Sequence, residues 1–127
     1  MNQRWIEKQA EETDELYGQF DMLLSMLQHH RTYVRVRGFR LICALAKWDT
    51  DGLIEKNIKL ILEQLQDEKP TSVRQCLAAL PKILQSQPQL RDDIHRKLER
   101  LDLSRYKDTM QPLFLLRRDI DSILREL

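Results

Sequence analysis

Apolar residues recur three or four positions apart along nearly the whole chain. This spacing places them on one face of a helix, whereas a strand would alternate apolar and polar residues. The apolar stretches predict helices over about 3–12, 14–27, 32–48, 53–66, 71–86, 88–101 and 109–127. The chain is therefore predicted to be all-α.

Threonines and prolines mark the expected ends of these helices. Turns are predicted at 49–52 and 67–70, where Pro70 should push Lys69 out of helical geometry. Pro81 lies inside an apolar stretch and should bend that helix. Four threonines stand where side-chain caps of helix N-termini are expected: Thr13, Thr32, Thr71 and Thr109.

A repeat of about 40 residues runs through the chain. At an offset of 39, five residues of the first copy fall on identical residues of the second: Thr32, Val34, Arg35, Leu41 and Leu45 on Thr71, Val73, Arg74, Leu80 and Leu84. A two-helix repeat of this length is typical of HEAT and armadillo arrays. We predict one domain over 1–127, a right-handed α–α superhelix of about 6–8 helices. Its helical pairs would cover about 14–48 and 53–86, with a degenerate capping pair over 88–127.

The repeated arginines Arg35 and Arg74 are expected to be structural, with ligand binding as the alternative. Each falls at the edge of the apolar arc, within reach of the preceding turn, and Glu68 is a candidate partner for Arg74. In HEAT arrays an arginine at this place joins one repeat to the next. Gly38 is costly inside a helix and indicates that a neighbouring helix packs closely there.

The composition excludes several classes of protein. Hydrophobic residues make up 42% and charged residues 32% of the chain, too apolar for a disordered segment. There is no apolar run long enough for a membrane span and no signal-peptide core, so we expect a cytoplasmic protein. Cys43 and Cys76 are expected to be reduced structural thiols, with a disulfide or metal site as the alternative. Neither a cofactor nor a metal is predicted, and the adjacent His29 and His30 lack metal-ligand spacing.

The net charge of +1 hides an uneven distribution. Residues 1–30 carry a balance of −4, whereas residues 31–48 carry five cations and no acid. On a helical wheel Arg37, Arg40 and Lys47 fall within about 80° of one another, away from the apolar arc. Such a basic stripe could bind phosphates or an acidic peptide, or it could pair with neighbouring acids. Trp48 ends the stripe, either as a stacking platform or as part of the core.

Three ordered segments resemble a known family: Arg37-Gly-Phe-Arg-Leu-Ile-Cys-Ala-Leu-Ala-Lys-Trp-Asp49, Asp67-Glu-Lys-Pro-Thr-Ser-Val-Arg-Gln-Cys76 and Tyr106-Lys-Asp-Thr-Met-Gln-Pro112. They resemble the hallmark segments of small bacterial HEAT-like repeat proteins often labelled "SufBD protein". The resemblance runs from about residue 17 to the end of the chain. It implies an all-α superhelix and carries over no catalytic residue.

The absence of any catalytic motif favours a binding protein over an enzyme. There is no GxSxG, P-loop, HExxH or GxGxxG sequence. We therefore expect a non-enzymatic scaffold that binds a protein or peptide on its concave face. The alternative is a nucleic-acid or phosphate ligand bound by the 32–48 helix, by analogy with HEAT-like DNA glycosylases. A homodimer is a third possibility. Charge reversal at Arg37 and Arg40 should abolish partner capture and leave the helical content unchanged.

Overall fold

The computed structural model confirms the all-α class. It describes residues 3–106 and 110–127, and the side chains of the last helix from residue 113 onward. Within these residues the chain forms helices and no strand. The α-helices are α1 (Gln3–Glu12), α2 (Phe20–Met26), α3 (Thr32–Ala44), α4 (Leu53–Lys56), α5 (Ile58–Glu63), α6 (Pro70–Ala79), α7 (Pro81–Ser86), α8 (Arg91–Glu99) and α9 (Met110–Glu126).

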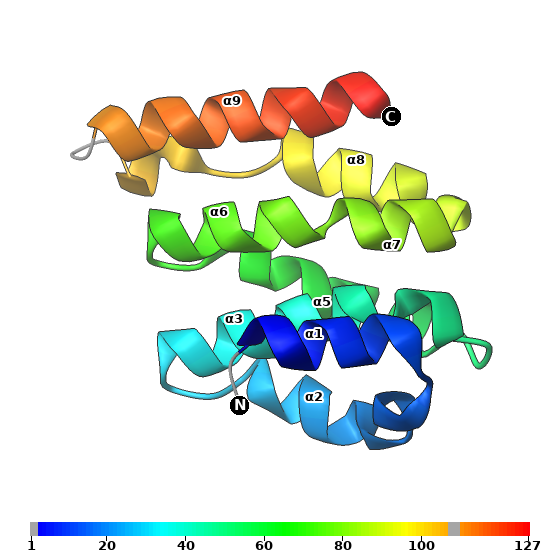
Figure 1. Ribbon diagram of the computed structural model, residues 1–127. Coiled ribbons are helices and arrows are strands. Elements are labelled where there is room, and N and C mark those ends of the chain that lie inside the picture. The colour runs from blue at the N-terminus through cyan, green and yellow to red at the C-terminus, as the bar shows by residue number, and fades with distance from the viewer. Residues whose placement is uncertain (1–2, 107–109) are drawn as a thin grey trace.

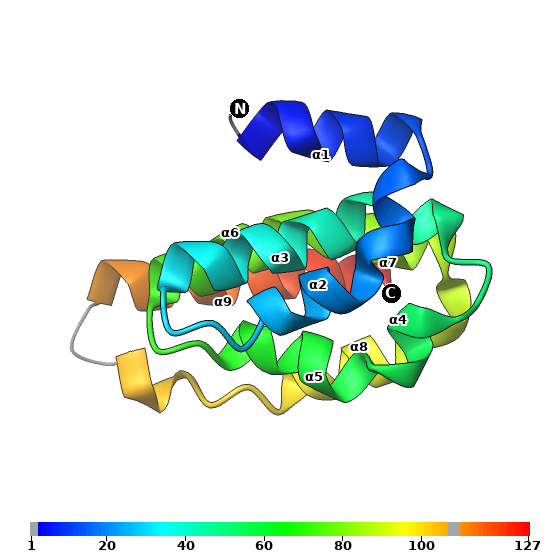
Figure 2. The same ribbon diagram turned by 90° about the horizontal axis from the view of Figure 1, so that it is seen from below.

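Most of the helices lie in two layers (Figures 1 and 2). One layer holds α3, then α6 with α7, then α9; the other holds α2, then α4 with α5, then α8. Within the first layer α3 packs against α6, and α6 packs against α9. Successive members of the first layer begin at residues 32, 70 and 110. The handedness of the superhelix and the assignment to HEAT or armadillo repeats stay predictions.

Helix α1 stands outside both layers and lies across α3, on the side away from α2 (Figure 2). Three contacts hold it there. The indole Nε1 of Trp48 donates a hydrogen bond of 2.9 Å to the carbonyl oxygen of Ala10. Arg40 pairs with Glu7, and Lys82 pairs with Glu11 at 2.9 Å. The acidic first helix thus neutralises part of the basic segment that follows it.

The core lies between the layers, and one close approach explains a glycine in the middle of α3. Gly38 faces α2, where an added Cβ would stand 2.8 Å from the Cβ of Met26 and 3.2 Å from the carbonyl oxygen of Leu23. A side chain there would collide with Met26 and press tightly against the Leu23 carbonyl. The expectation that a helix packs closely against Gly38 is therefore confirmed.

Helices α3 and α6 begin at, or one residue before, the threonines that were predicted to cap them. Helix α3 starts at Thr32 itself, and α6 starts at Pro70, so the N-cap positions belong to Arg31 and Lys69. Thr32 and Thr71 are thus not N-caps, and that prediction was wrong. Lys69 is extended, with φ −105° and ψ 120°, because the ring of Pro70 disfavours helical geometry in the preceding residue. Thr109 lies outside the described residues.

Five of the predicted helices are interrupted. The 14–27 and 88–101 helices begin with the 3₁₀ turns Glu15–Gln19 and Pro88–Leu90. The 71–86 helix divides into α6 and α7 at Pro81, as expected from its missing backbone donor. The 53–66 helix breaks at Asn57, whose side-chain Nδ2 donates to the carbonyl oxygen of Leu53 at 2.8 Å. The 32–48 helix ends at Ala44 and is followed by a 3₁₀ turn, Ala46–Trp48. This last difference changes the predicted basic stripe.

The predicted turn at 49–52 is organised by one carboxylate. Asp49 accepts hydrogen bonds from the hydroxyl of Tyr17 (2.7 Å), the backbone N–H of Leu53 (2.8 Å) and of Ile54 (2.9 Å), and the Nε2 of Gln87 (3.0 Å). Burial alone would raise the pKa of Asp49, but these hydrogen bonds outweigh it and lower the pKa below its usual value. Asp49 thereby ties together segments of both layers.

Candidate functional site

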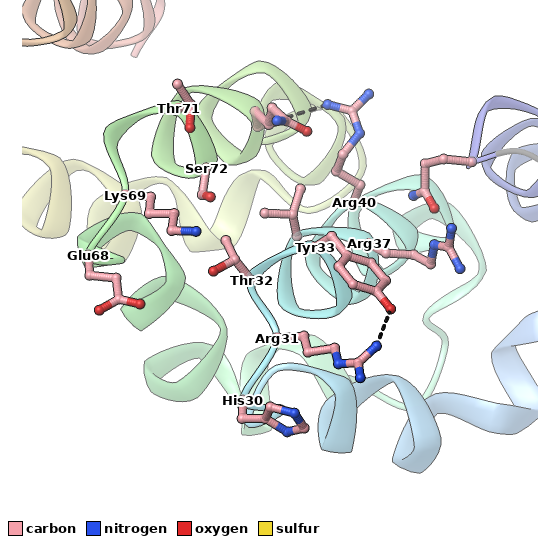
Figure 3. A pocket seen from close by; sticks show the side chains of 13 residues that line it. His30, Arg31, Thr32, Tyr33, Arg37, Arg40, Glu68, Lys69, Thr71 and Ser72 are labelled. Atoms are coloured by element: carbon pink, nitrogen blue, oxygen red, sulfur yellow. Dashed lines mark hydrogen bonds between the residues drawn. The ribbon is translucent and has the colours of Figure 1, made fainter.

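A groove of about 710 Å³ opens between the N-terminal ends of α3 and α6 and the start of α1 (Figure 3). We call it the α3–α6 groove. Four of its lining residues are cations and one is an acid, so it is strongly basic although the whole chain is nearly neutral. Its lining residues are Gln3, His30, Arg31, Thr32, Tyr33, Val36, Arg37, Arg40, Glu68, Lys69, Thr71, Ser72 and Gln75.

Two helix N-termini open into this groove, and neither is capped by a side chain. Arg31 and Lys69 have the extended backbone of an N-cap residue but carry no acceptor that could cap. Neither α3 nor α6 has an acid in its first turn. A cation at a helix N-terminus is unfavourable, because it adds to the positive end of the helix dipole. The positive charges at this end of the two helices therefore favour the binding of an anion.

Backbone donors are also available at both N-termini. Within the described part of the chain, the N–H groups of Thr32, Tyr33 and Thr71 donate no hydrogen bond. The first N–H groups of a helix have no partner inside the helix and must be satisfied from outside. The hydroxyls of Thr32 and Thr71 lie beside them in the groove wall (Figure 3). These donors suit carboxylate or phosphate oxygens.

Arg37 and Lys69 supply positive charge that no described residue neutralises. Neither side chain makes a hydrogen bond or ion pair within residues 3–106 and 110–127. Both amide atoms of the Gln3 side chain are buried beside the groove and likewise lack a hydrogen-bond partner there. Arg31 is held more firmly, since its Nη1 donates to the hydroxyl of Tyr33 at 3.2 Å (Figure 3). The groove thus combines two free cations with an unsatisfied amide.

Arg40 lines the same groove but is engaged within the protein. Its Nε lies 2.5 Å from Glu7 Oε1, and its Nη1 donates to the carbonyl oxygen of Gln75 at 3.0 Å. Glu7 is buried, so reversing the charge of Arg40 would place a second carboxylate beside a poorly hydrated one. We therefore expect such a reversal to loosen α1. Arg37 is the better probe of binding.

Lys47 and Trp48 do not line the groove. The helical wheel assumed a helix through residue 48, whereas α3 ends at Ala44 and the next turn changes the register. Lys47 instead lies over the indole ring of Trp48, with Nζ 5.4 Å from the ring centroid. The Trp48 ring packs against the core and its Nε1 is bonded to Ala10. The predicted stripe is therefore divided into a groove and a separate cation–π pair.

The repeated arginines join neighbouring helices. Arg35 donates to Asp67 Oδ2 at 3.0 Å and to the carbonyl oxygens of His29 and His30 at 2.8 and 3.0 Å. Arg74 pairs with Asp119 of α9 at 2.8 Å. The prediction that Arg74 pairs with Glu68 was wrong.

Glu68 lies instead 3.9 Å from Arg35, because Arg35 reaches forward to the turn before α6. Arg74 in turn reaches forward to α9. Each arginine thus contacts the helical pair that follows it.

His29 and His30 stack on each other beside the groove, with ring centroids 4.4 Å apart. Desolvation and the neighbouring His30 and Arg31 lower the pKa of His29, so it is neutral at pH 7. Its Nδ1 accepts the backbone N–H of Arg31 at 3.0 Å. This bond helps to hold Arg31 in the extended conformation at the start of α3.

Cys43 and Cys76 are free and buried in the core. Burial raises the pKa of Cys76 to about 12 and raises the pKa of Cys43 well above its usual range. Both thiols are therefore protonated and unreactive at neutral pH. The described residues contain no group of three or more His, Cys, Asp and Glu side chains placed to hold a metal ion.

The sequence pattern pointed to Arg37 and Arg40 but missed Arg31, Lys69 and Gln3 as groove residues. A local indication was present for Lys69, since a proline that follows it is favoured in the first position of a helix and makes Lys69 the N-cap. No comparable indication exists for Gln3. It reaches the groove only because α1 folds back across α3.

Comparison of the chain with models of protein families, with curated proteins and with solved structures finds no match. Among the described residues no helix has both the length and the apolar character needed to cross a membrane. The resemblance to small HEAT-like repeat proteins stays a prediction.

Proposed function

We propose that the protein is a non-enzymatic helical scaffold that binds a partner protein through an acidic segment held in the α3–α6 groove. One observation carries the proposal: two uncapped helix N-termini, each preceded by a cation, open into the same basic groove. An anionic ligand would satisfy the backbone donors and relieve the repulsion between cations and helix dipoles.

A peptide fits the lining as well as the charge. Tyr33 is 57% exposed and lines the groove, so the site offers apolar surface beside its cations. Exposed ion pairs contribute about 0.2–1 kcal/mol each, and an anion at a helix N-terminus contributes about 0.3–1 kcal/mol. A few such contacts give a weak complex that salt disrupts. We therefore expect transient capture of an acidic segment.

Fluorescence anisotropy with a labelled oligoglutamate peptide tests the proposal. The decisive variant is Arg37→Glu, because no described residue depends on this guanidinium. The matched control is Arg91→Glu, which makes the same charge change at an exposed position of α8 outside the groove. Arg37→Glu should weaken binding about tenfold, since an attraction of about 1 kcal/mol is replaced by a repulsion. Arg91→Glu should bind as the wild type does.

Equal losses in both variants would show that only net charge matters and would refute the groove as the site. A labelled single-stranded oligonucleotide serves as the competing ligand in the same assay. If the oligonucleotide binds more tightly than the peptide, with affinity that falls steeply with salt and depends on Arg37, the groove would be reassigned to phosphate ligands.

A further inference from the structure

The outer face of α9 carries a stripe of side chains that no described element covers. Phe114, Arg118, Asp121 and Arg125 follow one another at spacings of four, three and four residues, so they share one face of the helix. Phe114 is 68% exposed. The opposite face of α9 is buried through Leu116, Ile120 and Ile123 against α6 and α8. The stripe therefore points away from the protein.

The charges of this stripe are poorly satisfied within the chain. Asp121 and Arg125 form no ion pair with any described residue, and Arg118 reaches only Asp119, at 3.8 Å. A shallow depression of about 420 Å³ runs along the same face, between these side chains and Phe114. An exposed aromatic side chain beside unpaired charges of both signs is typical of a surface that meets another protein.

The order of the charges along α9 indicates which protein would bind to this stripe. We propose that α9 pairs antiparallel with α9 of a second copy of this chain, about a two-fold axis that passes beside residues 119 and 120. In this register Arg118 faces Asp121 of the second copy, and Phe114 faces Arg125 of the second copy. Because a two-fold interface is self-complementary, each contact forms twice. The result is two ion pairs in the middle and a cation–π contact at each end.

Several other antiparallel registers bring like charges together. An axis beside residue 121 would place Asp121 against itself, and an axis between residues 117 and 118 would place Arg117 against Arg118. An axis beside residue 123 would pair Asp121 with Arg125 but would leave Phe114 and Arg118 without a partner. With the axis beside residues 119 and 120, all four side chains of the stripe meet a complementary partner. The register is thus selected by charge as well as by the exposed aromatic side chain.

The pairing should be weak and dependent on concentration. Helix α9 has 17 residues and is about 25 Å long, so one helix face buries less than the about 800 Å² per partner of a standard interface. Two exposed ion pairs and two exposed cation–π contacts are each weak in water. We therefore expect a dimer that forms only as the concentration approaches about 1 mM and that dissociates on dilution.

Charge exchange tests this inference by sedimentation velocity from about 10 µM to about 1 mM. The wild type should dimerise reversibly in this range. Arg118→Asp alone and Asp121→Arg alone should each raise the dissociation constant about tenfold or more, because both pairs become repulsive. An equimolar mixture of the two single variants should dimerise again, since each chain then offers the charge that the other lacks. The double variant Arg118→Asp/Asp121→Arg should also recover.

The control is Met22→Ser on α2, another large apolar side chain, 47% exposed, that lies away from α9. It should leave dimerisation unchanged, whereas Phe114→Ser should weaken it. A wild type that stays monomeric up to the highest concentration would overturn the proposal. So would a mixture of single variants that fails to dimerise, or loss of the dimer on Met22→Ser. Circular dichroism confirms that each variant is folded, and peptide binding in the groove should be unaffected by all of them.

Discussion

Lys69 offers a test in which stability and binding change in opposite directions. It occupies the N-cap position of α6 with an extended backbone suited to capping, but its ammonium group cannot accept the free N–H of Thr71. The variant Lys69→Ser supplies a hydroxyl acceptor at this position and removes a cation from the positive end of the helix dipole. We expect the free energy of unfolding to rise and the affinity of the groove for an acidic peptide to fall.

The magnitude follows from the two effects. A serine at an N-cap is worth about 1 kcal/mol over alanine, and removal of a cation from a helix N-terminus adds about 0.3–1 kcal/mol. The sum is about 1.5 kcal/mol, or a rise of about 6 °C in the melting temperature of a domain of this size. Lys69→Ala removes the same charge without providing an acceptor. It should therefore be about 1 kcal/mol less stable than Lys69→Ser.

Urea and thermal unfolding followed by circular dichroism at 222 nm measure the stability. The oligoglutamate anisotropy assay measures the binding. Both variants should lose the same two- to fivefold in peptide affinity, because each lacks the same exposed cation of about 0.5–1 kcal/mol. If Lys69→Ser proves no more stable than Lys69→Ala, the reasoning that α6 has an uncapped N-terminus is refuted. If stability rises as expected and peptide affinity does not fall, Lys69 has no part in binding.

The remaining predictions concern the fold that holds the groove. Gly38→Ala gains about 1 kcal/mol of helix propensity, but its methyl group would collide with Met26, and overpacking costs about 1–3 kcal/mol. We therefore expect the variant to unfold at a lower urea concentration than the wild type. An unchanged midpoint would mean that α2 can shift away from α3 without loss of stability. Arg35→Gln leaves the carboxylate of Asp67, which is only 7% exposed, without its cation. The free energy of unfolding should fall by about 3 kcal/mol in the same assay, and a fall of less than about 1 kcal/mol would contradict this. Asp49 has a lowered pKa, so its contribution to stability is complete above about pH 4 and disappears as the pH falls through its folded pKa. Asp49→Asn should consequently lose less stability between pH 7 and pH 3 than the wild type, and equal losses would refute the role of this carboxylate.

The candidate site could be predicted from the sequence only in part. Arg37 was found because a local count of charges shows a basic segment, and it does face the groove. Lys47 belongs to the same segment but lies elsewhere, because a 3₁₀ turn after α3 rotates it out of register. Lys69 reaches the groove from a different helix, 32 residues further along the chain. A single helical wheel has no means of combining such positions.

The sequence by itself determined the all-α class of the protein and the approximate positions of its helices. It also shows the spacing of about 40 residues between equivalent positions in the chain. These properties depend on short-range periodicity and on the local preferences of proline and glycine, which act wherever the segment lies. Only the tertiary structure decided which cations remain free. Arg40 is neutralised by Glu7 from a helix 33 residues earlier, whereas Arg37, three positions away on α3, has no described partner. Pairing of charges depends on distances of a few ångströms between segments far apart in the chain, and those distances exist only once α1 has packed across α3.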